Sequence, residues 1–314
     1  MVTTYITGAR GFIGQHLARS LAAAGHTVAG VGHGNWPERE ACANGARYWL
    51  NGEILPGNLQ LLQRAVGLPE YVIHLAGGSS VGSAITNPRE DFFRTVVTTA
   101  ELLDWLRIEA PDAKLLVVSS AAVYGSGHTG QIPEDAESHP FSPYGYHKRV
   151  MEDLCRSYAA SYGQRAVIAR LFSVYGSGLK KQLLWDLCSR LASGVDPLVL
   201  SGSGDELRDW TDVRDVVSAL QTLLELADAS VPAFNVGTGR GSTVREIATL
   251  VRDCWFEPGR PAVSLQFSGE SRAGDPFSMI ARPDRLHSVG FRWHVELREG
   301  LANYLAWFRQ SSER

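Results

Sequence analysis

A strand, a glycine-rich turn and a helix follow one another at the start of the chain, and this order constrains the fold more than any other feature. The apolar run at 3–7 predicts a buried strand, and the periodic segment 11–25 predicts a helix. Gly8, Gly11 and Gly14 lie where the two meet, at the spacing G-x-x-G-x-x-G. Glycine allows a sharp turn and lets a pyrophosphate approach the N–H groups at a helix N-terminus. The turn therefore predicts a dinucleotide site, and the alternative is a tight turn without a ligand.

Strand and helix signals continue to alternate through the first half of the chain. Continuous apolar strands separated by helix-length segments are typical of a parallel sheet with helices on both faces. We therefore predict an α/β fold built on a doubly wound parallel Rossmann sheet. Beyond the first strand and helix, the expected strands are 26–32, 71–77, 114–125, 166–176 and 233–239, and the expected helices are 88–110 and 144–163.

The texture of the sequence changes in the second half, where short strands, polar loops and separate helices follow one another. This change predicts a dinucleotide-binding domain at 1–176, with returning segments at about 210–240. Residues 177–209 and 241–314 would form a smaller C-terminal lobe that binds the substrate.

Composition argues against several classes of partner. The chain has 314 residues, of which 44% are hydrophobic and 20% are charged, and its formal net charge is −3. It has no block of like charges, so we expect no nucleic-acid partner. It has no run of about 18 apolar residues and no signal pattern, so we expect no membrane partner and a cytoplasmic location. Its four cysteines are scattered without a C-x-x-C pair, which predicts neither a metal site nor a disulfide framework.

The end of the second strand bears on the identity of the dinucleotide. In NAD-binding folds an acidic residue near this point receives the ribose hydroxyls. Residues 31–35 read Val-Gly-His-Gly-Asn and carry no carboxylate. Nothing there would repel a 2′-phosphate, and His33 or Asn35 could donate a hydrogen bond to it. The choice between NAD and NADP therefore stays open.

Two tyrosines, a histidine and a lysine lie close together in the sequence after the strand at 114–125. The stretch 142–148 reads Ser-Pro-Tyr-Gly-Tyr-His-Lys and leads into a helix. Tyr144 and Lys148 are four residues apart, so they share one face of that helix. An ammonium group nearby favours the phenolate and would lower the tyrosine pKa from its usual value of about 10. The pair could therefore transfer protons; the alternative is a tyrosine packed at a helix start and a lysine in solvent.

These motifs together resemble the extended short-chain dehydrogenase/reductase family, and more narrowly its NAD(P)-dependent nucleotide-sugar epimerase/dehydratase group. The resemblance covers nearly the whole chain, because several stretches match in order at the family's spacing. Besides the glycine turn, these stretches are "VIHLAG" at 72–77, "VVSSAAVYG" at 117–125, "SPYGYHK" at 142–148, "ARLFSVYG" at 169–176, "SGSGDELRDWTDVRDV" at 201–216, "FNVGTG" at 234–239 and "RAGDP" at 272–276.

The resemblance implies a catalytic site formed by Tyr144, Lys148 and Ser120. Tyr144 would act as acid and base, Lys148 would tune its pKa, and Ser120 would hydrogen-bond the reacting sugar oxygen. Tyr146 and His147 lie at variable positions of the motif and are expected to be bystanders. The implied cofactor-binding residues are Gly8, Arg10, Gly11, Phe12, Ile13, Gly14, His33, Leu75, Ala76, Gly77, Tyr144 and Lys148. The implied substrate-binding residues are Tyr124, for which packing is the alternative, Ser173, and the diphosphate-binding arginines Arg208 and Arg272.

The resemblance also narrows the reaction. The 4,6-dehydratases that resemble this group carry Thr-Asp-Glu where this chain has Ser120-Ala121-Ala122, and two alanines cannot transfer protons. We therefore expect a 4-epimerase, an isomerase that forms a transient 4-keto sugar, acting on a nucleotide-diphosphate sugar. A 4-keto-sugar reductase that uses NADPH, which would be an oxidoreductase, is the alternative. A non-catalytic dinucleotide sensor on the same fold is a third class.

Two further expectations concern the helix at 88–110. Relatives often carry an asparagine where Thr95 stands, and threonine makes fewer hydrogen bonds, so weaker support of the catalytic lysine is expected. In relatives this helix and the helix at 144–163 pair across a subunit interface, which predicts a homodimer.

Overall fold

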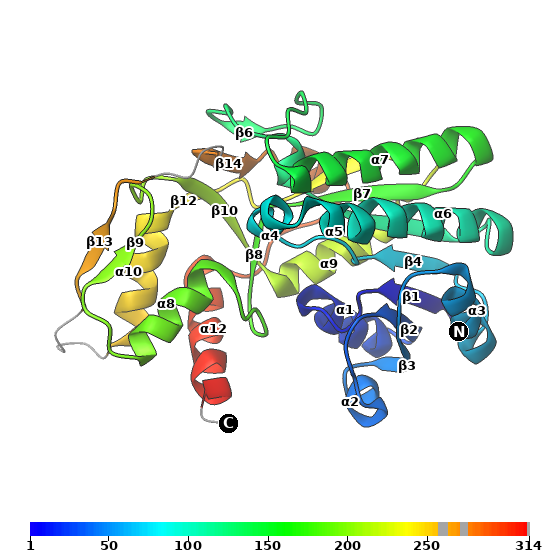
Figure 1. Ribbon diagram of the computed structural model, residues 1–314, viewed down its shortest axis with the longest axis horizontal. Helices are drawn as coiled ribbons and strands as arrows, with labels where there is room; N and C mark the ends of the chain where they lie inside the picture. The colour runs from blue at the N-terminus through cyan, green and yellow to red at the C-terminus, as the bar shows by residue number, and fades with distance from the viewer. Residues whose placement is uncertain (257–262, 271–275, 313–314) are drawn as a thin grey trace. The chain divides into compact units, whose positions relative to one another are not determined.

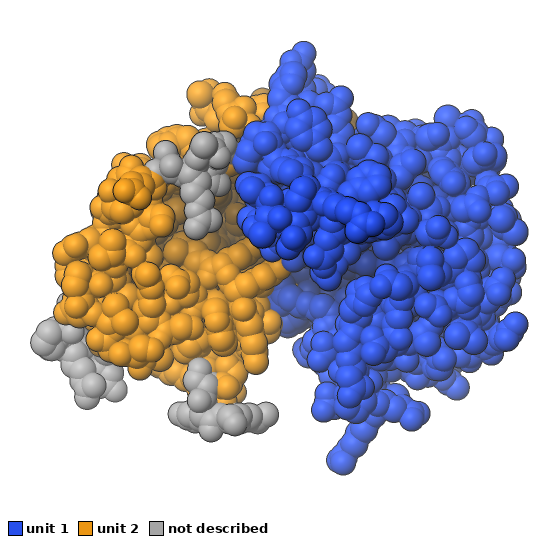
Figure 2. All heavy atoms as spheres, viewed as in Figure 1, with its two compact units in different colours: residues 1–125, 134–171, 217–235 blue, residues 126–133, 172–216, 236–314 orange. Residues whose placement is uncertain are grey.

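The structure is a computed structural model that describes residues 1–256, 263–270 and 276–312. The chain forms two compact units, which Figure 2 colours separately. The second stretch of unit 1 ends at residue 171, whereas we expected the domain boundary at 176. Unit 1 comprises residues 1–125, 134–171 and 217–235, and unit 2 comprises residues 126–133, 172–216 and 236–314.

A seven-stranded sheet forms the centre of unit 1 (Figure 1). Its strands run in the order β11-β7-β5-β4-β1-β2-β3, and the pairs β1–β2, β1–β4, β2–β3, β4–β5 and β5–β7 are parallel. The bounds are β1 Thr3–Thr7, β2 Thr27–Gly32, β3 Ala46–Asn51, β4 Tyr71–His74, β5 Lys114–Ser120, β7 Ala166–Leu171 and β11 Ala233–Val236.

The strand order confirms the predicted doubly wound sheet. From β1 the sheet grows in one direction through β2 and β3, and in the other through β4 and β5. The order therefore reverses between β1 and β4, and ligands of such sheets bind outside the carboxyl ends of the strands at this reversal. The glycine turn follows β1, so it lies at the expected place.

Helices cover both faces of this sheet. The helices of unit 1 are α1 Phe12–Ala23, α2 Glu38–Ala43, α3 Pro56–Val66, α4 Val81–Thr86, α5 Pro88–Phe92, α6 Thr98–Glu109, α7 Pro143–Tyr162 and most of α9 Val213–Leu224, with a 3₁₀ turn η2 at Ala121–Val123. Residues of α3, α6 and α7 pack into one core cluster against the sheet. On the opposite face α1 and α9 lie side by side, where the Ser20 hydroxyl donates to the Gln221 side chain at 2.9 Å (Figure 1).

The helix expected at 88–110 is interrupted by a π-helical turn, η1, at Phe93–Val97. The hydroxyl of Thr98 donates to the carbonyl of Arg94 at 2.5 Å, and the hydroxyl of Thr99 donates to the carbonyl of Thr95 at 2.6 Å. Threonine hydroxyls can thus donate hydrogen bonds to carbonyls one turn earlier, where the backbone hydrogen bonding of the helix is irregular. Turns of this kind are frequent at functional sites.

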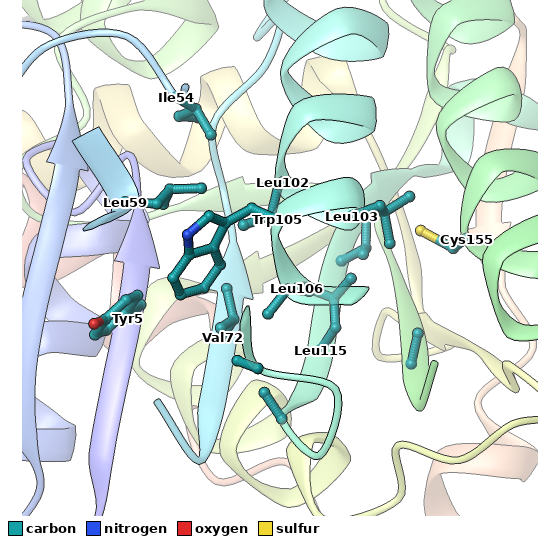
Figure 3. Packing of buried hydrophobic residues seen from close by; sticks show 14 of the residues in the cluster. Tyr5, Ile54, Leu59, Val72, Leu102, Leu103, Trp105, Leu106, Leu115 and Cys155 are labelled. Carbon is teal, nitrogen blue, oxygen red and sulfur yellow. The ribbon is translucent and has the colours of Figure 1, made fainter. Parts of the chain in front are cut away.

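Trp105 on α6 fills the centre of the core cluster of unit 1 (Figure 3). Its ring stacks on Tyr5 of β1 at 6.1 Å between centroids, and both side chains are almost fully buried. Leu59 of α3 and Val72 of β4 surround it. This packing fixes α6 against the sheet, and with it the π turn that precedes α6.

Unit 2 is built around strand β10 (Leu207–Asp212), which is not among the strands that the sequence predicted. β10 pairs with β8 and β14 in parallel and with β12 in an antiparallel ladder. The other elements of unit 2 are β6 Gln131–Ile132, β8 Ser173–Tyr175, β9 Leu198–Leu200, β12 Gly241–Thr243, β13 Leu265–Phe267, β14 Ser278–Ala281, α8 Gln182–Ala192, α10 Val244–Trp255, α11 Asp284–Ser288 and α12 Leu297–Ser312. Within the described ranges, no helix combines the length and apolar character that crossing a membrane requires.

Candidate active site

The glycine turn after β1 has the shape that the dinucleotide prediction requires. Gly8 has a φ of +75°, and its N–H donates to the Val31 carbonyl at 2.7 Å. A Cβ on Gly8 would lie 3.2 Å from the Ala76 nitrogen, and one on Gly14 would collide with the Gly8 carbonyl. Side chains are therefore excluded from the turn, which leaves its backbone open to a bound group.

The start of α1 can bind an anion. Gly11 is the N-cap of α1, and as a glycine it has no side chain to accept a hydrogen bond from the first N–H groups of the helix. Phe12 and Ile13, both predicted cofactor contacts, form that first turn. A pyrophosphate placed there would accept these N–H groups and gain from the positive end of the helix dipole. The residues present thus fit a dinucleotide.

The turn after β4 lies against the glycine turn, as the contact between Gly8 and Ala76 indicates. The Ala76 N–H donates to the Thr7 hydroxyl at 3.2 Å, and Thr7 also contacts the His74 ring at 2.7 Å. Burial lowers the pKa of His74 to about 3, so this histidine is neutral and serves as a structural hydrogen-bonding group. The predicted contacts Leu75, Ala76 and Gly77 are therefore positioned beside the glycine turn.

The guanidinium of Arg10, which belongs to the glycine turn, lies at the end of β2. A Cβ on Gly34 would lie 2.5 Å from the Arg10 guanidinium, so the Arg10 side chain rests on the Gly34 backbone. His33 is exposed, and its Nε2 lies 3.4 Å from the carboxylate of Glu53. An arginine near this point accommodates a 2′-phosphate in dinucleotide sites. Glu53 is a nearby acid that the sequence argument missed, because it follows the unpredicted strand β3.

The start of α7 brings Tyr144 to the end of β5. Ser142 is the N-cap of α7, and its hydroxyl accepts the Gly145 N–H at 3.2 Å. A Cβ on Gly145 would collide with the Ala122 carbonyl, so only glycine lets α7 approach the 3₁₀ turn after β5 this closely. The approach places Tyr144 in a hydrogen bond with Ser120, which itself accepts the Ala122 N–H at 3.2 Å.

Lys148 lies one turn further along α7 and is only 3% exposed. Its ammonium donates to the Val118 carbonyl at 2.9 Å and lies 6.0 Å from the centre of the Tyr144 ring. Burial lowers the pKa of Lys148 to about 8, while the charges of Asp91 and Glu152 oppose that shift. The structure thus brings the three predicted catalytic residues together.

The pKa of Tyr144 differs from the sequence expectation. In the protein alone it is raised, chiefly because burial disfavours the phenolate, and Asp91 raises it further. The hydrogen bond with Ser120 lowers it. The lowering that we expected from a nearby ammonium is therefore not seen in the protein alone, and Tyr144 is a neutral phenol at neutral pH.

Two residues on the interrupted helix contact the elements that form this site. Asp91 on α5, which the sequence argument did not consider, accepts a hydrogen bond from Nδ1 of His147 at 2.6 Å, so His147 has a packing role rather than a place among the three catalytic candidates. The Thr95 hydroxyl accepts the Gly78 N–H at 2.8 Å and so supports the turn after β4. A single sequence gave no signal for the Asp91–His147 contact, because the two residues lie 56 positions apart.

The predicted sugar contact Tyr124 lies in a buried polar network. Its hydroxyl donates to the Asn235 side chain at 2.7 Å and accepts from Arg170 at 2.8 Å. Arg170 in turn binds both carboxylate oxygens of Glu152, at 2.9 and 2.7 Å. Tyr124 is 0% exposed, so its position favours the packing role over a sugar contact.

The remaining predicted substrate residues belong to unit 2. Ser173 begins β8 and is partly exposed. Arg208 lies on β10, where one guanidinium nitrogen donates to the Leu207 carbonyl at 2.8 Å. Arg272 lies outside the described residues.

Comparisons with known proteins agree with this geometry. The model of the NAD dependent epimerase/dehydratase family matches residues 4–237. A UDP-glucose 4-epimerase of Azospirillum brasilense is 30% identical over 305 residues, which cover 90% of this chain and 84% of that protein. A GDP-6-deoxy-D-mannose reductase of Pseudomonas aeruginosa is 32% identical over 259 residues, 79% of each protein.

A solved structure extends the comparison to three dimensions. The structure of MoeE5 in complex with UDP-glucuronic acid and NAD has a TM-score of 0.85 and 30% identity, and the match covers 98% of this chain and 99% of MoeE5. The resemblance inferred from the motifs is therefore confirmed over nearly the whole length. The chain belongs to the NAD-dependent epimerase/dehydratase family.

Proposed function

We propose that the protein is an NAD(P)-dependent nucleotide-sugar 4-epimerase that works through a transient 4-keto sugar. The proposal rests on one observation: Ser120, Tyr144 and Lys148 lie close together at the carboxyl edge of the sheet. They lie on the same edge as the glycine turn after β1. Such an arrangement suits proton transfer at a hydroxyl that is being oxidised. The epimerase relatives support the same reading.

Each of the three side chains has a defined task in this proposal. The Tyr144 phenol would carry the proton that leaves and later returns to the sugar 4-oxygen, and Ser120 would hold that oxygen through its hydroxyl. The Lys148 ammonium would stabilise the phenolate while the proton is away. A nicotinamide dinucleotide held by the glycine turn after β1 and the start of α1 would supply the hydride chemistry that this cycle needs at the sugar carbon.

The neutral resting state of Tyr144 fits this cycle. Burial holds its pKa above the usual value, so proton loss needs positive charge close by. Water elimination has no acid and base here, because Ala121 and Ala122 occupy the turn after Ser120. The site therefore supports epimerisation or reduction rather than dehydration.

We propose a nucleotide-diphosphate sugar as the substrate. Unit 1 would bind the dinucleotide, and Ser173, Arg208 and Arg272 of unit 2 would bind the substrate. A guanidinium can bind phosphate oxygens in pairs, which suits Arg208 and Arg272 to a diphosphate. The similarity to a UDP-glucose 4-epimerase and to MoeE5, whose structure contains UDP-glucuronic acid, supports UDP as the first nucleotide to test.

A 4-keto-sugar reductase that uses NADPH is the second candidate. The Arg10 guanidinium on Gly34 favours it, because a cation at the end of β2 would bind a 2′-phosphate. The reductase relative from Pseudomonas aeruginosa points the same way. Both candidates use the same three catalytic side chains, so the retained cofactor separates them.

We also propose a homodimer formed through α5, η1 and α7. Phe92, Phe93, Tyr146 and Val150 are large apolar side chains on these neighbouring elements, and each is at least 39% exposed. A second copy would remove this apolar surface from water. Light scattering of the purified protein would give twice the mass of one chain, and a monomer at micromolar concentration would contradict the proposal.

The decisive experiment combines the released cofactor with turnover. We expect the purified protein to retain NAD, seen by mass spectrometry after denaturation, and to interconvert UDP-hexoses that differ at C4. Tyr144→Phe should keep the cofactor and lose at least about 10²-fold in turnover, since general acid–base groups contribute about that much or more. Tyr146→Phe, two residues away on the exposed side of α7, is the matched control and should turn over normally.

The outcomes separate the candidates. Net oxidation of NADPH with a 4-keto sugar, without interconversion of C4 epimers, would replace the epimerase by the reductase. Near-normal turnover of Tyr144→Phe would remove Tyr144 as the proton carrier.

A further inference from the structure

Asp91 is a buried carboxylate with one strong partner in the described part of unit 1. Its side chain is 5% exposed, and that of His147 is 15% exposed. A carboxylate can only accept, so His147 donates from Nδ1 across the 2.6 Å contact. The Phe92 ring packs edge-on against the His147 ring at 5.5 Å, which fixes the imidazole further. The pair ties α5 to the first turn of α7, next to Tyr144 and Lys148.

Asp91 and Lys148 contact neighbouring residues of the same turn. A Cβ on Gly78 would overlap the Asp91 carboxylate, so that carboxylate lies directly on the Gly78 backbone. A Cβ on Gly77 would lie 3.3 Å from the Lys148 ammonium. The two opposite charges therefore flank a two-glycine turn that has no side chain to separate them. Thr95 holds the same turn through the Gly78 N–H.

We propose that Asp91, oriented by His147, is a positioning residue that keeps Lys148 in its ammonium form beside Tyr144. This inference rests on the proposed function, because it concerns the same proton-transfer pair. Thr95 supports the backbone of the turn, and Asp91 supplies the charge. The sequence led us to expect weak support of Lys148 from Thr95. In this proposal Asp91 provides that support instead.

The charges around Lys148 leave Asp91 with a distinct role. Glu152, one turn further along α7, also favours the ammonium, but Arg170 binds both of its oxygens. His74 on β4 is neutral, and Tyr144 on α7 is protonated. Glu90 and Arg94, the neighbouring charges on α5 and η1, pair with each other at the surface. Among the residues that the structure describes, no guanidinium binds Asp91, so it offers Lys148 a negative charge without such a partner.

The electrostatic balance agrees with this assignment. Burial is the main cause that lowers the pKa of Lys148, and Asp91 is the first of the opposing causes. A carboxylate close to an amine favours the charged form of that amine and raises its pKa. Replacing Asp91 by a neutral side chain should therefore let burial neutralise Lys148 at physiological pH.

The small number of lysines allows a direct test on the whole protein. The chain has only Lys114, Lys148, Lys180 and Lys181, so lysine labelled with ¹³C at Cε gives few NMR signals. Lys148→Arg identifies the signal of Lys148. In the wild type we expect its titration midpoint at about pH 8. In Asp91→Asn the midpoint should fall by about one unit or more.

Matched variants separate charge from structure. Glu90→Gln removes the adjacent exposed carboxylate and should leave the midpoint of Lys148 unchanged. His147→Asn keeps a donor near the Nδ1 position and should resemble the wild type more closely than His147→Leu does. Asp91→Ser, a smaller neutral side chain on Gly78, replaces Asp91→Asn if that variant does not fold.

Turnover gives a second readout. The alkaline limb of the kcat profile should follow the Lys148 midpoint and move to lower pH in Asp91→Asn, with KM little changed. An unchanged Lys148 midpoint in folded Asp91→Asn or Asp91→Ser would overturn the proposal, whatever happens to turnover. A shifted midpoint in a protein that turns over no nucleotide sugar would instead support the role of Asp91 and reject the proposed reaction.

Discussion

Lys148 and Glu152 lie one turn apart on α7 and are almost equally buried, at 3% and 1% exposed, yet opposite forces set their protonation. Glu152 has a pKa below its usual value, because Arg170, Ser119 and Arg156 together outweigh burial. Lys148 has a pKa well below its usual value, because burial outweighs Asp91 and Glu152. The Glu152 carboxylate has a full set of partners, so it stays ionised. The Lys148 amine has an incomplete set, so its protonation state can change near physiological pH.

Breaking the ion pair between Glu152 and Arg170 should have the largest effect on stability. Arg170→Met leaves the Glu152 carboxylate buried without its bidentate partner, which costs about 3–5 kcal/mol of unfolding free energy. Chemical denaturation at neutral pH measures this loss. Arg156→Met is the matched control: Arg156 binds the same carboxylate, but its side chain is 41% exposed, so its loss should be about 1 kcal/mol or less. Equal losses in the two variants would contradict the distinction.

Removing the charge of Lys148 should change the stability little and greatly reduce turnover. Lys148→Met replaces a buried amine whose folded pKa lies below its unfolded value, so the charged amine opposes folding below about pH 8. We expect a change in unfolding free energy within about 1 kcal/mol, because the variant loses the hydrogen bond to the Val118 carbonyl but no longer buries an amine that opposes folding. Turnover should fall at least about 10²-fold. A stability loss as large as that of Arg170→Met would mean that Lys148 is a structural charge like Glu152.

A third prediction concerns one hydrogen bond to the Glu152 carboxylate, whose loss should cost less than the loss of Arg170. The Ser119 hydroxyl donates to Glu152 at 2.6 Å, and Ser119→Ala removes it while both arginines remain. A hydrogen bond to a charged group is worth about 1.5–3 kcal/mol, and we expect a loss near the lower value at neutral pH. The folded pKa of Glu152 is depressed, so its stabilising effect is present above the unfolded value and is lost as pH falls through the folded value. The difference between wild type and Ser119→Ala should therefore shrink in acid; a pH-independent difference would contradict this account.

The sheet could be predicted from the sequence, because its strands are continuous apolar runs separated by helix-length segments. The strand β3 was missed: it reads Ala-Arg-Tyr-Trp-Leu-Asn, and only its first residue is buried. The strand β10 was missed for a related reason, since the charged residues Arg208 and Asp209 interrupt any apolar run there. Asp209 is in fact buried and accepts the N–H groups of Thr238 and Gly239.

The catalytic residues could be predicted because they lie in short motifs whose spacing follows one helix. Tyr144 and Lys148 are neighbours on α7, and Ser120 ends a strand that the apolar pattern reveals. The supporting residues could not be predicted in this way. Asp91 reaches His147, and Glu152 reaches Arg170, through contacts between different elements, which the periodicity of one element does not encode.

The π turn at Phe93–Val97 has a consequence for how this site can change. An i→i+5 turn takes in about one residue more than an ordinary turn, so it offsets the helical phase of α5 from that of α6 by about 100°. Asp91 and Thr95 can therefore point at the two-glycine turn while Trp105 still points into the core. Losing one residue from this segment would restore a regular helix and rotate the acid away from the lysine, with the packing of α6 left in register.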